Sequence, residues 1–397
     1  MHKGILNFFI MCLFLFQLSC IEDEKIVNSN TVVKSKIEQV LSAEWGDVVN
    51  KQNLLIKGYA IYVNSSKGLF YISVGELKNS TTLTKYIIGE NINSFIASSI
   101  LLLYQQKKLN LDSYITSLIP NSTEPYIPES REYNIPYKNN ISIRKLLLHR
   151  SGVFDLLYEN IPVTVNAPFA GKNYFNYVID QLKEPDTVFN TDELFKIISK
   201  YKLYSFEPGV SFRHSNMGYA LLAKISERVT GKTYYDFINE NFLLPNGLIH
   251  TKCYSFIKQK SVEDTVLNIA KNTKINSVNN VLGGVITNIE DLTRWYTKLF
   301  RGKAGISENN VKYLIMNSLP TENPNLFYGL GCIYLPKLGY GNFGEYNGLW
   351  NLYMYNPEEN VTFGIFAFTD NKNTNKDEML TKLYSIAENA KKALSED

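Results

Sequence analysis

Apolar side chains recur at helical spacing in several parts of the chain. After Asn91 they follow at steps of three and four residues, as Ile92, Phe95, Ile96, Ile100 and Leu103. This spacing places them on one face of a helix, which should end near Lys107 and Lys108 because basic side chains suit a last turn. Further helices are predicted over SKIEQVLSAEWGDVV, YALLAKISERV, LTRWYTKLF and DEMLTKLYSIAENAKKAL.

Strand-like runs occupy both ends of the sequence. GYAIYVNSSKGLFYISVGEL contains two apolar runs around a turn at Asn64–Gly68, and LFYGLGCIYL, GLWNLYMYNP and NVTFGIFAFT lie near the C-terminus. The region between them, roughly 111–300, is predicted to be mainly helical. Strands at both ends with helices inserted between them predict an α+β fold with a helical insert.

The first twenty residues are predicted to lie outside this fold. Lys3 precedes an apolar run from Ile5 to Leu18, which is short for a membrane span and typical of a signal peptide. Because the run ends on Ser19-Cys20, it resembles a bacterial lipoprotein signal, although Gln17 stands where such signals prefer leucine. We therefore expect a signal peptide over 1–19, lipidation of Cys20, a tether over 20–33 and a domain over 34–397 on a bacterial envelope (outer membrane or cell surface). A plain secretory signal and an uncleaved anchor remain alternatives.

Composition excludes some functions. The 397 residues carry a net charge of only +3, without a basic block, so nucleic-acid binding is not expected. Four histidines and no His/Cys spacing predict no metal site, and no cofactor is expected. Cys253 and Cys332 remain outside the N-terminal segment, and the sequence leaves open whether they pair.

Several long segments, in order, resemble the serine β-lactamase and penicillin-binding-protein superfamily, and its class C-like branch most of all. These segments are YIIGENINSFIASSILLLYQQKKLNLDSYITSLIP, ISIRKLLLHRSGVFD, FEPGVSFRHSNMGYALLAKISERVTGKTYYDFINENFLLPNGLIHT, YGLGCIYL and GNFGEYNGLWN, so the resemblance covers roughly residues 35–390. It implies a β-lactamase/transpeptidase-like fold, with an antiparallel sheet built from N- and C-terminal strands, flanking helices and a helical insert.

The resemblance also locates the catalytic positions, and there the sequence departs from the family. Family members use a serine at a helix N-terminus, a lysine three residues later, a Tyr-x-Asn tyrosine and a His-x-Gly or Lys-x-Gly on a strand. The corresponding residues are Glu90, Asn93, His214 and Asn342. The scaffold residues Asn216 and Gly344 are kept.

These replacements favour a protein without hydrolase activity. A carboxylate at position 90 has no lysine to activate it and is a poor nucleophile toward esters and amides. Its simplest role is to cap its own helix and occupy part of the oxyanion site. The vestigial pocket would then bind a peptide, glycan or protein through Glu90, Asn93, His214, Asn216, Asn342 and Gly344.

Two other hypotheses remain open at this point. A Glu90/His214 acid–base pair, or a serine from elsewhere in the pocket, could make the protein a hydrolase of esters, amides or glycosides. A purely structural or interaction role without a small ligand is the third. Two residue patterns are set aside: Gly339–Gly344 matches G-x-G-x-x-G without the strand–turn–helix context of a phosphate site, and His149 is expected to pack in the core.

Overall fold

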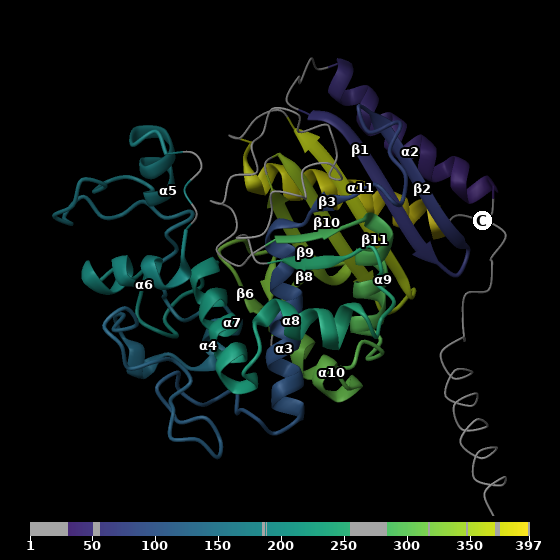
Figure 1. Ribbon diagram of the computed structural model, residues 1–397. Helices are drawn as coiled ribbons and strands as arrows, with labels where there is room; N and C mark the ends of the chain where they lie inside the picture. The colour runs from purple at the N-terminus through teal and green to yellow at the C-terminus, as the bar shows by residue number, and fades with distance from the viewer. Residues whose placement is uncertain are drawn as a thin grey trace, which may run out of the picture.

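The computed structural model describes residues 31–50, 56–184, 187, 189–254, 284–316, 318–346, 348–369 and 374–395 (Figure 1). The predicted signal peptide, Cys20 and most of the predicted tether lie outside these residues. The tether prediction overlaps the first helix, α2 (Thr31–Asn50), because Val33 already packs in a buried cluster. The domain therefore begins slightly before residue 34.

The largest element in the described part of the chain is an antiparallel eight-stranded sheet with the order β2-β1-β11-β10-β9-β8-β7-β6. The N-terminal hairpin thus joins the C-terminal strands, which confirms the predicted sheet and the α+β class. The strands are β1 (Ile56–Ser65), β2 (Gly68–Gly75), β6 (Leu319–Pro320), β7 (Phe327–Tyr328), β8 (Ile333–Leu335), β9 (Gly339–Tyr346), β10 (Leu349–Asn356) and β11 (Val361–Thr369).

Central strands are buried on both faces. Along β1, Tyr59, Ile61 and Val63 enter one hydrophobic cluster, whereas Ala60 and Tyr62 enter another. This alternation follows from the two-residue period of a strand. The helices α2 and α11 (Lys376–Ser395) cover the first face, and α9 (Ile289–Phe300) packs on β10 and β11 at the second (Figure 1).

The second face also carries the helical half of the molecule (Figure 1). Its helices are α3 (Ile92–Gln105), α4 (Ile143–Leu147), α5 (Tyr174–Asn176), α6 (Thr191–Lys200), α7 (Asn216–Thr230), α8 (Tyr234–Ile238) and α10 (Glu308–Met316). The predicted helix after Asn91 is confirmed as α3, which is buried over most of its length.

The predicted helical insert is not entirely helical. A small antiparallel sheet contains β3 (Tyr86–Ile87), β4 (Lys252–Tyr254) and β5 (Gly284–Thr287), of which β4 and β5 fall inside the predicted insert. Such short strands carry too few residues to show a two-residue period, so tertiary pairing defines them. In the ranges described, no helix is long and apolar enough to cross a bilayer. Cys253 and Cys332 are both buried and unpaired, which answers the question left open by the sequence.

Candidate functional site

The site is built where the start of the buried helix meets strand β9. A short 3-10 turn over Gly89–Asn91 precedes α3. Gly89 has φ of +52°, and a Cβ there would lie 2.1 Å from the carbonyl oxygen of Glu345. A Cβ on Gly344 would lie 2.7 Å from the carbonyl oxygen of Ile88. The two glycines therefore allow the turn and the strand to touch through their backbones.

Glu90 directs its carboxylate across this junction. The side chain is 6% exposed, and its Oε2 accepts a hydrogen bond from the backbone N–H of Glu345 at 2.7 Å. Its Oε1 accepts from the Tyr158 hydroxyl at 3.0 Å and from the Lys376 ammonium at 3.0 Å. The backbone N–H of Glu90 itself also stabilises the carboxylate. Donors from β9, from the connection that holds Tyr158 and from α11 thus all bind the Glu90 carboxylate.

The geometry gives Glu90 contacts beyond a capping role. Its carboxylate is stabilised by its own backbone N–H in the 3-10 turn, and it also reaches across to the Glu345 amide of β9. Asn91, the N-cap of α3, makes no side-chain capping bond. The resemblance implies that the strand carrying Gly344 supplies one of two oxyanion-binding amides. The Glu90 carboxylate accepts from the Glu345 amide on that strand and is stabilised by its own backbone N–H, so it occupies the space between these two amides.

Electrostatics fix the protonation states of this group of side chains. Burial acts to raise the pKa of Glu90, but the Lys376 charge and the Glu345 amide outweigh it and hold the pKa below its usual range. Burial acts to lower the pKa of Lys376, and the Glu90 charge raises it above its usual value. Burial and then the Glu90 charge raise the pKa of Glu345 to about 7. At neutral pH, Glu90 is therefore an anion and Lys376 a cation.

A second group of polar side chains lies beside this ion pair. Asn93 Nδ2 lies 3.4 Å from His214 Nε2, and the rings of His214 and His149 are 4.2 Å apart between centroids. Burial, together with the Lys376 charge, holds the pKa of His214 well below its usual range. His149 is buried in the core, as expected, and its Nδ1 accepts from the Ser215 amide at 3.0 Å.

Glu90 and His214 belong to different hydrogen-bond groups. In the described ranges no hydrogen bond or ion pair joins them, because Glu90 is held by Tyr158 and Lys376, whereas His214 faces Asn93. A neutral imidazole beside an amide does not hold the carboxylate as an acid–base partner would. The structure thus brings Asn93 and His214 together and leaves Glu90 with other partners.

The remaining predicted site residues have structural partners. Asn216 donates to Asp155 Oδ2 from its backbone N at 2.9 Å and from Nδ2 at 3.1 Å. Asn342 donates from Nδ2 to the Gly331 carbonyl at 2.9 Å. Both asparagines are buried, as are Asn93 and Gly344. Most members of the predicted set are therefore enclosed by the fold, and His214 is partly exposed.

Three residues of the site were missed by the sequence analysis: Tyr158, Glu345 and Lys376. Glu345 directly follows Gly344, so its amide was implied by the strand position, but its carboxyl group was not considered. Lys376 is the first residue of the closing helix, far from Glu90 in sequence, and Tyr158 lies in a long connection. No spacing rule links these positions, and only the tertiary fold brings them together.

Elsewhere in the described ranges, a cavity of about 200 Å³ opens beside α6 and α7. Its charged side chains have partners: Lys224 lies 3.3 Å from Asp192, and Glu227 accepts from the Tyr234 amide. The cavity is lined by Asn190, Thr191, Asp192, Ala220, Ala223, Lys224, Glu227 and Tyr234.

Within the described ranges, no group of three or more His, Cys, Asp or Glu side chains could hold a metal ion.

Comparisons with known proteins agree with this fold. Protein flp from Staphylococcus aureus is 25% identical over 257 residues, which cover 63% of this chain and 45% of that protein. Penicillin-binding protein 4* from Bacillus subtilis is 24% identical over 216 residues, or 54% of this chain and 38% of that protein. The chain thus spans less than half the length of these relatives.

Solved structures show the same architecture. D-amino acid amidase from Ochrobactrum anthropi SV3, complexed with D-phenylalanine, superposes with a TM-score of 0.68 at 18% identity, over 92% of this chain and 99% of that one. A penicillin-binding protein from Bacillus halodurans superposes with a TM-score of 0.60 at 17% identity, over 90% and 98% of the two chains. The family model named Beta-lactamase matches residues 92–388, well over half of the sequence. The chain therefore belongs to the beta-lactamase family.

Proposed function

We propose that this family member has lost hydrolase activity and acts by binding. The observation that carries the proposal is the saturated carboxylate of Glu90, which takes up the amide of Glu345, the hydroxyl of Tyr158 and the ammonium of Lys376. With Glu90's own backbone N–H as a fourth donor, the roughly four lone-pair sites of the carboxylate are taken, and the group fills the place of a developing oxyanion. Neither Asn93 nor His214 supplies the cation or strong base that would activate a nucleophile at position 90.

The competing hypothesis is a hydrolase that uses Glu90 and His214 as an acid–base pair. It requires the two side chains to act on one substrate, but they belong to separate hydrogen-bond groups. Glu90 also has a lowered pKa, which makes it a weaker base than an ordinary carboxylate. The geometry therefore favours the non-catalytic function.

Binding is proposed at the solvent side of the site, in front of the buried Glu90 carboxylate. Tyr158 is 54% exposed and the Lys376 side chain is 46% exposed, although both touch the buried Glu90 carboxylate. His214 and Glu345 are partly exposed beside them. These four residues, called the rim below, offer rings, donors and an acceptor to a peptide, glycan or protein.

The proposal predicts that fluorophosphonate and fluorescent penicillin probes do not label the purified chain. Without a serine activated by a base, no acyl or phosphonyl adduct should accumulate. Gel fluorescence and intact-mass measurement would check this, with a penicillin-binding protein as the positive control. Saturable labelling of a single serine would contradict the proposal, and so would ester hydrolysis that disappears in Glu90→Gln.

We further propose that the protein is an exported lipoprotein anchored through Cys20 to a bacterial envelope. The proposal is supported by the basic start, the apolar run and the Ser-Cys ending of the N-terminal segment. Metabolic labelling with an alkyne fatty acid should tag the wild-type chain, whereas Cys20→Ser should lose the tag and leave the membrane fraction. Cys12→Ser is the matched control and should keep both. Equal labelling of all three chains would refute lipidation at Cys20.

A further inference from the structure

Lys376 places its ammonium between a carboxylate and two aromatic rings. Nζ lies 3.0 Å from Glu90 Oε1, 5.5 Å from the ring centroid of Tyr158 and 5.9 Å from that of Phe343. Both ring distances fall within the range of cation–π attraction. Together, Glu90, Tyr158 and Phe343 form what is called the ammonium cage below.

The charges around the cage also favour a cation. Besides Glu90, the carboxyl groups of Glu345 and Asp155 act on the ammonium from β9 and from the connection after α4. The two nearby imidazoles, His149 and His214, add no positive charge at neutral pH because their pKa values lie well below the usual range. The charges that act on the Lys376 ammonium are therefore those of carboxylates, and the two imidazoles beside it stay neutral.

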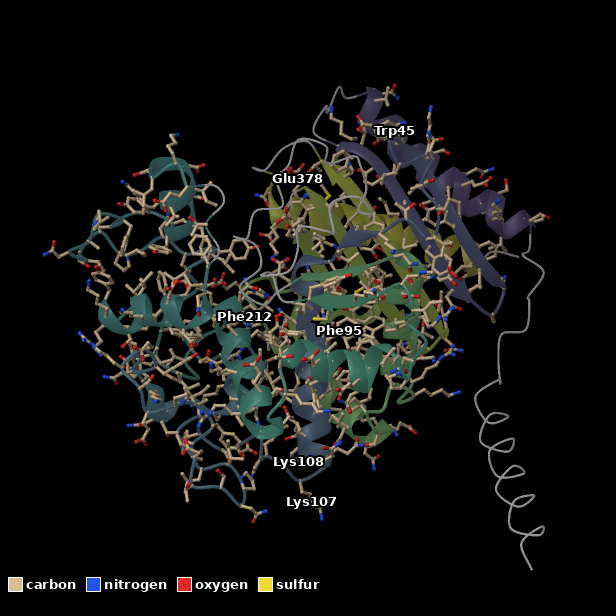
Figure 2. The ribbon with its side chains drawn as sticks, viewed as in Figure 1. Trp45, Phe95, Lys107, Lys108, Phe212 and Glu378 are labelled. Carbon is tan, nitrogen blue, oxygen red and sulfur yellow. The ribbon has the colours of Figure 1, made fainter. Side chains whose placement is uncertain are left out.

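The cage lies at the boundary between core and solvent. Glu90 and Phe343 are buried, whereas the Lys376 and Tyr158 side chains are about half exposed. Lys376 begins α11, and Glu378, labelled in Figure 2, marks this end of the helix on the side toward the helical half. A cation could therefore replace the Lys376 ammonium from solvent without opening the hydrophobic core.

We propose that the ammonium cage of Glu90, Tyr158 and Phe343 is a binding site for the primary ammonium group of a ligand, and that Lys376 is its built-in occupant. This inference rests on the proposed function and extends the binding site from the rim to the buried Glu90 carboxylate, which a ligand reaches by displacing Lys376. A carboxylate with two aromatic faces is a recognition geometry for ammonium groups. Because it is covalently attached, Lys376 competes with a ligand ammonium for the cage at an effective concentration in about the millimolar range. A ligand must therefore make further contacts on the rim to displace it.

The first test removes the occupant. Nα-acetyl-lysine methylamide is titrated against the wild-type chain and Lys376→Met by calorimetry, with Nα-acetyl-norleucine methylamide as the uncharged control. We expect Lys376→Met to bind the lysine compound at least about tenfold more tightly than the wild type does, because the tethered competitor is gone. The affinity for the norleucine compound should not increase in Lys376→Met. The increased affinity for the lysine compound should disappear in Lys376→Met/Glu90→Gln. Glycinamide serves as a second amine and separates recognition of a peptide amino terminus from recognition of a lysine side chain.

A second test uses the wild-type chain and does not depend on the folding of a variant. Methylammonium chloride should displace Lys376 and speed its acetylation relative to Lys312, as read by mass spectrometry, whereas sodium chloride at equal ionic strength should not. The ratio to Lys312 corrects for reagent that the added amine consumes. An unchanged ratio of Lys376 to Lys312 acetylation would overturn the inference, as would equal affinities of the two acetylated compounds for Lys376→Met.

Failure of this inference is separable from failure of the proposed function. If an amine-free peptide or glycan fragment binds the wild-type chain and Tyr158→Ala abolishes that binding, the rim is a binding surface even though the cage does not take amines. If the probes label an active serine, the proposed function fails whatever the amines do.

Discussion

Lys376→Met should destabilise the protein by about 2–3 kcal/mol at pH 7. Glu90 is 6% exposed and ionised, so removal of the Lys376 ammonium leaves a buried negative charge without its cation. Loss of one partner of a fully buried pair costs about 3–5 kcal/mol, and the smaller value here reflects the 46% exposure of Lys376, which lets water replace part of the interaction. Urea denaturation of both chains would measure the difference.

The pH dependence gives this prediction a direction. Because the pKa of Glu90 is lowered by folding, its contribution is present above the unfolded value of about 4.3 and is lost as pH falls through the folded value. The raised pKa of Lys376 makes its contribution complete below about 10.4 and lost at higher pH. The deficit of Lys376→Met should therefore be largest near neutral pH and shrink on acidification, as Glu90 becomes protonated.

Two control variants separate charge from packing. Lys312→Met removes an exposed pair with Glu308 and should change stability by less than about 0.5 kcal/mol. Lys376→Met/Glu90→Gln removes both charges of the buried pair and should recover most of the loss. A single variant that is as stable as the wild type would show that the Glu90 carboxylate does not need Lys376.

Sequence reasoning predicted the fold well because its signals are long and local. The apolar period after Asn91 became α3, and the terminal strands met in one antiparallel sheet, as the resemblance implied. The short strands β4 and β5 escaped because their pairing partners are distant in sequence. The local sequence pattern therefore predicts the long helices and strands, whereas the short strands depend on tertiary contacts.

The candidate site was predicted only in part. Motif positions located Glu90 and the Asn93–His214 pair, which the structure places in hydrogen-bond range. Motifs could not show that the side-chain amide of Asn216 donates to Asp155 or that the side-chain amide of Asn342 donates to the Gly331 carbonyl. They also gave no sign of Lys376, because an ion pair across the fold leaves no spacing in the chain. The chemistry of a site depends on such partners as much as on its motif residues.

Restoring the family residues should return measurable serine reactivity. The variant Glu90→Ser/Asn93→Lys/His214→Tyr clears the carboxylate from the amides of residues 90 and 345 and supplies a nucleophile with a base. Asn93 Nδ2 lies 3.4 Å from His214 Nε2, so side chains at these two positions can reach each other. We expect fluorophosphonate labelling at position 90 at least about 100-fold faster than in Glu90→Ser alone, which has the nucleophile without the base, because a positioned base contributes roughly 10²–10⁴.

Glu345 should limit the rate of this restored site. Its carboxyl group lies close enough to Glu90 for the two charges to interact, and burial and then the Glu90 charge raise its pKa to about 7. Once the Glu90 charge is removed, that pKa should fall and leave an anion next to the developing negative charge, which opposes the reaction. Adding Glu345→Gln should therefore speed labelling further, and most strongly above neutral pH. A folded variant set in which neither the serine nor the glutamine substitution changes labelling would mean that more than these three motif positions separates this chain from its active relatives.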